Sequence, residues 1–223
     1  ILLGFGYDEI LSSSLVPRPH AGIGEDDHRV VEVLNPVSKE RPCLRTSLVS
    51  SLLEAVDLNI RNGIHALRLF EIGRVFTRGN GGAFSETTKA GIVLTGNRCE
   101  RTWYGDERAA DFFDLKGTVE ALLEALYLDN DTIFQYDRHS TLSEHVLTLE
   151  VKGEYAGQAI VVSDAILENF GIQQPVYFAE LDVNVLRAAA PERQVYVPVA
   201  RYPSVTRDLA VLLRKEIRAA QLE

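Results

Sequence analysis

Two stretches with the composition of strands, separated by a glycine-rich turn, constrain the fold of this chain more than any other feature. Residues 67–76 and 90–94 are the expected strands, and Arg78-Gly79-Asn80-Gly81-Gly82 is the expected turn. Strands joined through a short turn lie antiparallel. A second pair of strands, at 146–151 and 155–162, follows the same scheme. The sequence therefore predicts a mainly antiparallel sheet.

An amphipathic helix is predicted from Ser47 to Asn62. Thr46 or Ser47 provides an N-cap and Gly63 provides a stop. Glu54 is assigned to the solvated face. Apolar residues recur at helical spacing and are expected in the core: Leu48, Leu52, Val56 and Ile60.

A second helix is expected to begin at Asp114, which is a favourable N-cap residue. It contains Gly117, which costs about 1 kcal/mol relative to alanine in a helix, so another backbone is expected to come close there. A short helix at 164–170 precedes a strand at 176–183, and two N-terminal strands are expected at 9–16 and 30–34. This mixture indicates an α+β fold.

Composition excludes several classes of protein. The two cysteines, Cys43 and Cys99, have neither the spacing nor the nearby histidines of a zinc site or a disulfide framework. No apolar run reaches the roughly 18 residues that span a bilayer, so no membrane partner is expected. The chain contains no methionine, which favours a piece of a longer polypeptide.

Five short runs, in this order and spacing, resemble the beta subunit of bacterial phenylalanyl-tRNA synthetase. The resemblance covers nearly the whole chain. It implies a class II aminoacyl-tRNA synthetase-like antiparallel sheet flanked by helices, followed by the beginning of a ferredoxin-like domain. The runs are residues 35–48 from Asn35-Pro36, residues 68–76 from Arg68 to Phe76, Asp111-Phe112-Phe113-Asp114-Leu115-Lys116-Gly117, residues 176–182 and residues 201–209.

The resemblance also implies a domain plan and a set of partners. Residues 1–190 would form a catalytic-like domain without catalytic activity, and residues 191–223 the truncated start of an anticodon-binding domain. The partners would be the alpha subunit, in a cytoplasmic (alpha beta)2 heterotetramer, and tRNA(Phe). The whole enzyme uses ATP and magnesium, whereas this part is expected to hold no cofactor.

The residues themselves argue against catalysis. The second class II motif of the family places an arginine and an acid two apart on a strand, so that both face the site. At the matching strand this chain has Arg68 and Glu71, which are three apart and should point to opposite faces unless a bulge intervenes. At the third class II motif, the strand has no glycine or arginine for a nucleotide. It carries Glu180 and Asp182 on one face, which would repel a triphosphate. No catalytic, cofactor-binding or metal-binding residue is therefore predicted.

Two candidate surfaces follow from the resemblance. Apolar surface near Ile1, Leu2, Leu3 and Phe5 is expected to be exposed unless a partner or a further chain segment covers it. The residues predicted at the subunit interface are Phe5, Leu34, Asn35 and Pro36.

The C-terminal part is basic. Residues 187–218 contain seven basic and three acidic residues, although the whole chain has a net charge of -9. A basic segment can contact a phosphate backbone, whereas an acidic body repels one. An ordinary solvated surface explains the same count equally well. The predicted tRNA-binding residues are Arg201, Arg207, Arg214 and Lys215.

Two other functions require residues that the sequence lacks. An independent ATP-dependent amino-acid ligase would need the missing arginine and glycines, and a free-standing RNA-binding module would need more aromatic residues among the basic ones. A metal site at His139 and His145 lacks an evident third ligand. The family usually carries a histidine-proline-glycine-arginine run there, so the role of this turn stays open.

Overall fold

The computed structural model describes residues 1–223 except 24–26, 80, 99–102, 104–107, 138–141, 144–145, 192–201, 203–204, 213 and 215–223. The chain divides into two compact units, Ile1–Pro191 and Glu192–Glu223. In the second unit, the residues that the structure describes (202, 205–212 and 214) form no helix or strand. The described helices and strands all belong to the first unit.

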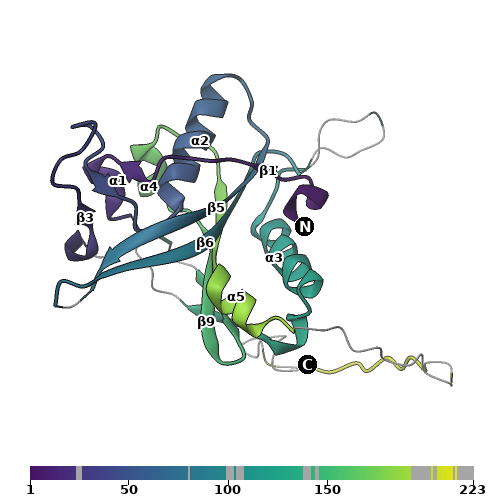
Figure 1. Ribbon diagram of the computed structural model, residues 1–223. Helices are drawn as coiled ribbons and strands as arrows, with labels where there is room; N and C mark the ends of the chain where they lie inside the picture. Colours follow the sequence, from purple (N-terminus) through teal and green to yellow (C-terminus); the bar gives the residue numbers. More distant parts are fainter. Residues whose placement is uncertain are drawn as a thin grey trace. The chain divides into compact units, whose positions relative to one another are not determined.

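The first unit is built on a seven-stranded sheet (Figure 1). The first edge strand, β1, runs parallel to its neighbour, and the other neighbouring strands are antiparallel. This confirms the predicted antiparallel sheet and both predicted hairpins. In spatial order the strands are β1 (Asp8–Glu9), β5 (Leu67–Arg78), β6 (Phe84–Thr95), β10 (Val176–Asp182), β9 (Glu154–Val161), β8 (Val146–Val151) and β7 (Thr132–Asp137).

Helices cover both faces of the sheet and create two apolar cores. On one face lie α2 (Val49–Arg61) and α4 (Asp164–Asn169). On the other face lie α3 (Phe112–Ala125), α5 (Val183–Ala189) and the 3-10 helix η1 (Leu2–Phe5) (Figure 1). Because successive strand residues point to opposite faces, the five inner strands β5, β6, β10, β9 and β8 each contribute side chains to both cores.

The N-terminal region differs from the two strands predicted at 9–16 and 30–34. Instead, β2 (Leu15–Val16), β4 (Cys43–Leu44) and β3 (Val31–Glu32) form a small separate sheet. Between β1 and β2, the backbone N–H and the hydroxyl of Ser12 donate to the Glu71 carboxylate. The Ser12 N–H is therefore engaged by a side chain and does not pair with a neighbouring strand. The remaining short elements are α1 (Arg18–Ala21), η2 (Asp27–Arg29) and η3 (Asp129–Asp131).

Helix α3 corrects two predictions. Its N-cap is Asp111, not Asp114, because the Asp111 side chain accepts from the Asp114 N–H while the Asp114 side chain accepts from the Asp111 N–H. The expected close approach at Gly117 is also wrong: no atom lies within 4 Å of the position of an added Cβ. Gly117 lines a hollow of about 380 Å³ beside β7.

Helix α2 begins two residues later than predicted, at Val49, with Leu48 as its N-cap. Gly63 has the positive φ of 84° expected of the stop residue. Glu54 does not belong to a fully solvated face. It is half-buried and accepts from Arg41 (2.9 Å), and its other oxygen lies 3.0 Å from His20 Nδ1.

Candidate functional site

The face of the sheet beneath α2 holds a buried ion pair. The Arg45 guanidinium donates to the Glu71 carboxylate at 2.9 Å, and the two side chains are 2% and 1% exposed. Arg45 also donates to the hydroxyls of Ser12 (2.7 Å) and Ser51 (3.2 Å) and to the Arg74 carbonyl (3.0 Å). The charges are thus compensated inside the protein, as buried charges must be.

Two glycines let these groups lie directly on the sheet. A Cβ at Gly73 would lie 2.3 Å from Arg45 Nη2, and a Cβ at Gly91 would lie 2.7 Å from Leu52 Cδ1 and 2.9 Å from Leu48 Cβ. Neither position could accept a side chain without displacing α2 or Arg45. Where a nucleotide-binding sheet would leave space for a ligand, this face is filled by the chain's own side chains.

The two acids of the third motif serve structure. Glu180 on β10 accepts from the Leu48 N–H and from the Ser47 hydroxyl, both at 2.8 Å, and so holds the beginning of α2. Asp182 caps α5 through the Asn184 N–H and pairs with Lys89 at 3.0 Å. The Lys89 ammonium neutralises the Asp182 carboxylate, and neutral donors at the start of α2 satisfy the Glu180 carboxylate, so both acids are engaged within the protein.

Arg68 and Glu71 lie on opposite faces of β5, as predicted. Glu71 points towards α2, whereas the Arg68 guanidinium lies over the Tyr7 ring, 5.8 Å from its centroid, and donates to the Arg98 carbonyl. The two side chains cannot act on one phosphate group.

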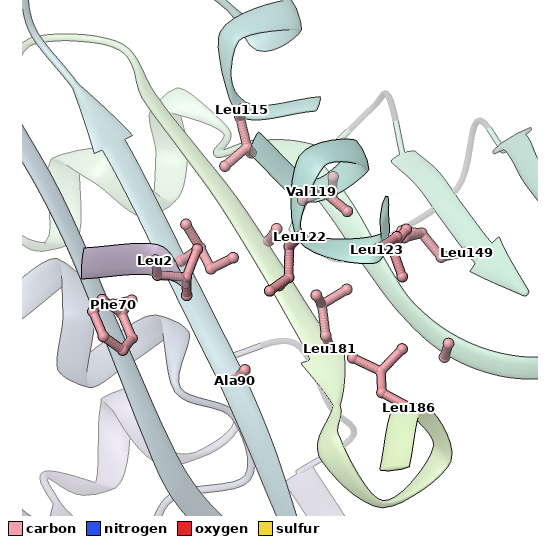
Figure 2. Close-up of a cluster of buried hydrophobic side chains, with 14 of the residues drawn as sticks. Leu2, Phe70, Ala90, Leu115, Val119, Leu122, Leu123, Leu149, Leu181 and Leu186 are labelled. Atoms are coloured by element: carbon pink, nitrogen blue, oxygen red, sulfur yellow. The ribbon is translucent and has the colours of Figure 1, made fainter. Parts of the chain in front are cut away.

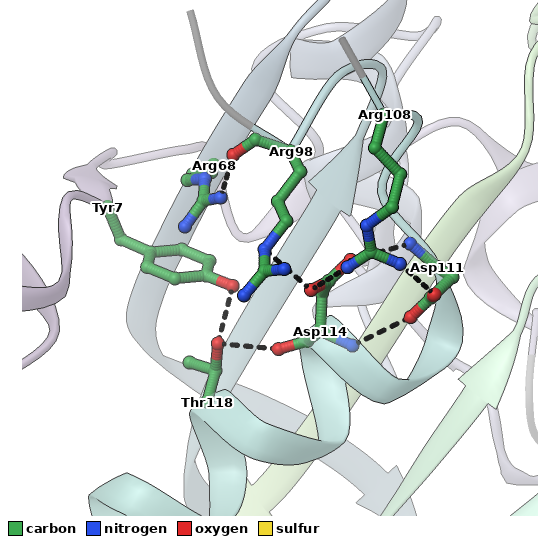
Figure 3. A network of polar contacts seen from close by, with 7 residues as sticks. All are labelled: Tyr7, Arg68, Arg98, Arg108, Asp111, Asp114 and Thr118. Carbon is green, nitrogen blue, oxygen red and sulfur yellow. Dashed lines mark hydrogen bonds and ion pairs between the residues drawn. The ribbon is translucent and has the colours of Figure 1, made fainter. Parts of the chain in front are cut away.

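A polar network joins the N-terminal segment to the start of α3 (Figure 3). The Asp114 carboxylate pairs with Arg98 (3.1 Å) and Arg108 (2.8 Å), and Arg108 also pairs with Asp111. The Thr118 hydroxyl donates to the Asp114 carbonyl at 3.0 Å and therefore accepts from the Tyr7 hydroxyl at 3.0 Å. These pairs fix the two ends of the segment between β6 and α3.

The pKa values of Tyr7 and Asp111 show how this network is charged. Burial raises the pKa of the Tyr7 phenol and outweighs the lowering effects of Thr118 and Arg68. For Asp111, desolvation acts to raise the pKa, but hydrogen bonds from the Asp114 N–H and from Arg108 prevail and lower it. Asp111 and its arginine partner are therefore charged at neutral pH, and the network holds structure together without a group poised for proton transfer.

An apolar groove opens on the other face of the sheet, between η1, α3 and α5. Its volume is about 590 Å³. Figure 2 shows how Leu2, Phe70, Leu122 and Leu186 converge at its base from four elements. The complete lining is Ile1, Leu2, Leu3, Glu9, Phe70, Ile72, Ala90, Leu122, Leu126, Val183, Leu186, Arg187 and Ala190.

Apolar side chains remain accessible at the groove. Ile1, Leu3 and Ile72 are 56%, 63% and 50% exposed, whereas Leu2 is buried, contrary to the expectation that it too would be exposed. Leu2 packs into the same core as Phe70. The N-terminal part of this surface was predicted from the sequence, whereas the α3 and α5 walls were not, although the leucine spacing in α3 was a usable signal.

The predicted interface residues are not gathered in one place. Phe5 ends η1 and is exposed. Leu34, which is 97% exposed, and Asn35 and Pro36 follow β3 at the far side of the sheet from η1 (Figure 1). Phe5 belongs to η1, whose residues Leu2 and Leu3 line the groove although Phe5 itself does not, and the other three residues lie on a separate loop.

Of the predicted tRNA-binding residues, Arg207 and Arg214 are described and exposed. Arg201 and Lys215 lie outside the described residues, as do His139 and His145. In the described part of the chain, no group of three or more histidine, cysteine or acidic residues is placed to hold a metal ion. Among the described helices, none has both the length and the apolar character needed to cross a membrane.

Comparison with known proteins identifies relatives over the whole chain. The beta subunit of phenylalanine–tRNA ligase from Chlorobaculum tepidum is 36% identical, and the alignment covers 100% of this chain and 29% of that protein. The corresponding subunit from Symbiobacterium thermophilum is 35% identical over 100% of this chain and 26% of that protein. The chain spans less than a third of the length of these relatives.

Solved structures show the same fold. Two structures of pyrrolysyl-tRNA synthetase from Desulfitobacterium hafniense superpose with TM-scores of 0.63 and 0.64 at 16% identity, covering 83% of this chain and 63% and 64% of theirs. Residues 1–183 match the family described as the phenylalanyl tRNA synthetase beta chain CLM domain. The chain thus has a class II tRNA synthetase-like fold and belongs to the phenylalanyl-tRNA synthetase beta-chain family.

Proposed function

We propose that this chain is the non-catalytic, synthetase-like part of a phenylalanine–tRNA ligase beta subunit. It pairs with the catalytic alpha subunit in a cytoplasmic (alpha beta)2 heterotetramer and supports the charging of tRNA(Phe). The whole ligase uses ATP and magnesium, and this part holds neither. Residues 191–223 begin a ferredoxin-like anticodon-binding domain.

The filled face of the sheet carries the non-catalytic part of the proposal. The Arg45–Glu71 pair and the leucines of α2 occupy the surface above Gly73 and Gly91. In the described part of the chain, every buried side-chain nitrogen and oxygen has a hydrogen-bond partner. No buried side-chain nitrogen or oxygen among these residues therefore needs a nucleotide as its hydrogen-bond partner.

The apolar groove supports pairing with the alpha subunit. Large apolar patches on a soluble protein mark surfaces that another element covers. The groove combines a packed apolar floor with the exposed side chains of Ile1, Leu3 and Ile72. Glu9 and Arg187 at the groove supply charges of both signs, which suits an apolar partner surface with a polar rim.

A binding experiment tests this pairing. The chain is titrated with purified alpha subunit in a calorimeter, as wild type and as Leu3→Glu, which places a charge in the groove. We expect Leu3→Glu to weaken binding at least tenfold, because burying an unpaired carboxylate is costly. The control is Leu11→Glu, the same substitution at a side chain that is 93% exposed and does not line the groove.

Equal affinity of Leu3→Glu and wild type would remove the groove from the interface. Light scattering measures the mass of the chain alone and tests whether a second copy of the chain occupies the groove. A concentration-dependent dimer that Leu3→Glu abolishes would assign the groove to a second copy of this chain.

The absence of catalysis is tested with ATP. Titration with ATP and magnesium is expected to give no saturable heat, because among the described residues side chains fill the sheet face beneath α2 and its buried cation, Arg45, is already paired with Glu71. Binding with 1:1 stoichiometry together with phenylalanine-dependent pyrophosphate exchange would refute the proposal.

A further inference from the structure

We infer that Lys152, together with the Lys89–Asp182 pair, positions α5 as a preformed wall of the apolar groove, so that the alpha subunit meets a ready-made surface. This inference rests on the proposed function of the groove. It assigns to Lys152, in the turn between β8 and β9, a role in binding the partner although Lys152 does not line the groove.

Helix α5 needs external support. It has seven residues, and isolated helices of this length are unstable in water. Its packing face is small: within the helix, only Leu186 and Ala189 are buried. Yet Val183, Leu186 and Arg187 form one side of the groove. The position of this wall therefore depends on what holds the two ends of the helix.

The N-terminal end is held by a charged pair. Asp182 Oδ1 accepts from the N–H groups of Asn184 (2.9 Å) and Val185 (3.2 Å), and Oδ2 pairs with Lys89 Nζ at 3.0 Å. The Lys89 and Asp182 side chains are only 18% and 16% exposed, so the pair is shielded from solvent. Because Lys89 belongs to β6, the beginning of α5 is tied to the sheet.

Lys152 holds the C-terminal end. Its ammonium donates to the Ala189 carbonyl at 2.8 Å, which supplies a partner for a carbonyl that the end of the helix leaves without one. The Lys152 N–H donates to the Asp131 carbonyl at 2.9 Å, and Nζ lies 3.5 Å from Asp131 Oδ2. The positive φ of 51° at Lys152 places this residue at the tight turn between two core strands. The end of α5 is thus fastened to the far part of the sheet.

A preformed wall favours binding because α5 loses less conformational entropy when the partner binds. If α5 frayed, Val183 and Leu186 would leave the groove for part of the time. The apparent affinity for the alpha subunit would then fall in proportion to the fraction of molecules in which α5 is folded. The same surface would then bind the alpha subunit more weakly, although every residue that touches the partner would still be present.

The test uses Lys152→Met, which keeps the aliphatic stem but removes the donor. Two quantities are measured for each variant: hydrogen exchange of the amides of residues 183–190, and affinity for purified alpha subunit. We expect faster exchange in α5 with unchanged exchange in α3, and binding weakened about fivefold, which corresponds to one hydrogen bond of ordinary net strength. Lys152→Arg, which restores a donor, is expected to recover both.

The matched control is Arg61→Met, which removes another ion-paired cation, at the end of α2 on the opposite face of the sheet. It is expected to change neither quantity. Unchanged exchange in Lys152→Met would show that Lys152 does not position α5. Faster exchange with unchanged affinity would show that the α5 wall takes no part in binding, and would overturn the inference while leaving the pairing intact. Failure of the wild-type chain to bind would refute the proposed function itself, and the exchange data would still decide whether Lys152 holds α5.

Discussion

At the scale of single residues, the Arg45–Glu71 pair determines the character of the sheet face beneath α2. Both side chains are almost fully buried. Removing one partner from such a pair leaves an uncompensated charge, whereas replacing both with apolar residues removes the problem. We therefore expect Arg45→Met to lower the free energy of unfolding by about 3–5 kcal/mol, measured by urea denaturation.

The double variant Arg45→Met/Glu71→Met provides the check on this reasoning. It is expected to be more stable than Arg45→Met alone, because Glu71 no longer remains buried without its guanidinium partner. A double variant that loses the sum of both single losses would show that the two charges act independently.

Residue-level reasoning from the sequence succeeded where a local rule decides the outcome. The separation of Arg68 and Glu71 follows directly from the alternation of side chains along a strand. The partners of Glu180 could not be predicted, because they lie at Ser47 and Leu48, more than 130 positions away in the chain. Such long-range contacts leave no periodic signal in the sequence.

At the scale of elements, α2 is placed by its leucines. Leu52 is fully buried, and a Cβ added at Gly91 would lie 2.7 Å from its Cδ1. Leu52→Ala is expected to lower the free energy of unfolding by about 2–5 kcal/mol, through reduced apolar burial and the remaining cavity. Leu58→Ala, the same substitution in the same helix at a side chain that is 62% exposed, is expected to cost about 0.5 kcal/mol or less. Equal losses in chemical denaturation would mean that α2 is packed on a different face.

The elements themselves were largely predictable, and their ends were not. The apolar spacing of α2 and α3 and the turn between β8 and β9 gave the correct elements, because each is a local pattern. The start of α3 was misplaced since Asp111 and Asp114 are both good caps, and only the reciprocal capping box decides between them. The groove is formed by η1, α3 and α5 together, so no single stretch of sequence predicts it.

At the scale of the whole molecule, charge is divided unevenly. Residues 187–218 carry four more basic than acidic residues, which leaves the rest of the chain with a net charge of -13. Arg207 and Arg214 are exposed, as binding to phosphates requires. An acidic body repels RNA, so tRNA binding is expected only at the basic C-terminal part.

In a full-length beta subunit, replacing Arg201 and Arg207 together with alanine is expected to weaken tRNA binding in a salt-dependent way. The log-log salt slope is expected to flatten by up to about 0.9 for each phosphate that the variant no longer neutralises, taking the value for duplex DNA as a guide. Replacing Arg61 and Arg74, which are exposed arginines of the first unit, serves as the control and is expected to leave the slope unchanged. An unchanged slope with a lowered melting temperature in the Arg201/Arg207 variant would mean that these arginines pair with carboxylates of the protein. The basic segment would then be a structural feature of its own domain, with no part in tRNA binding.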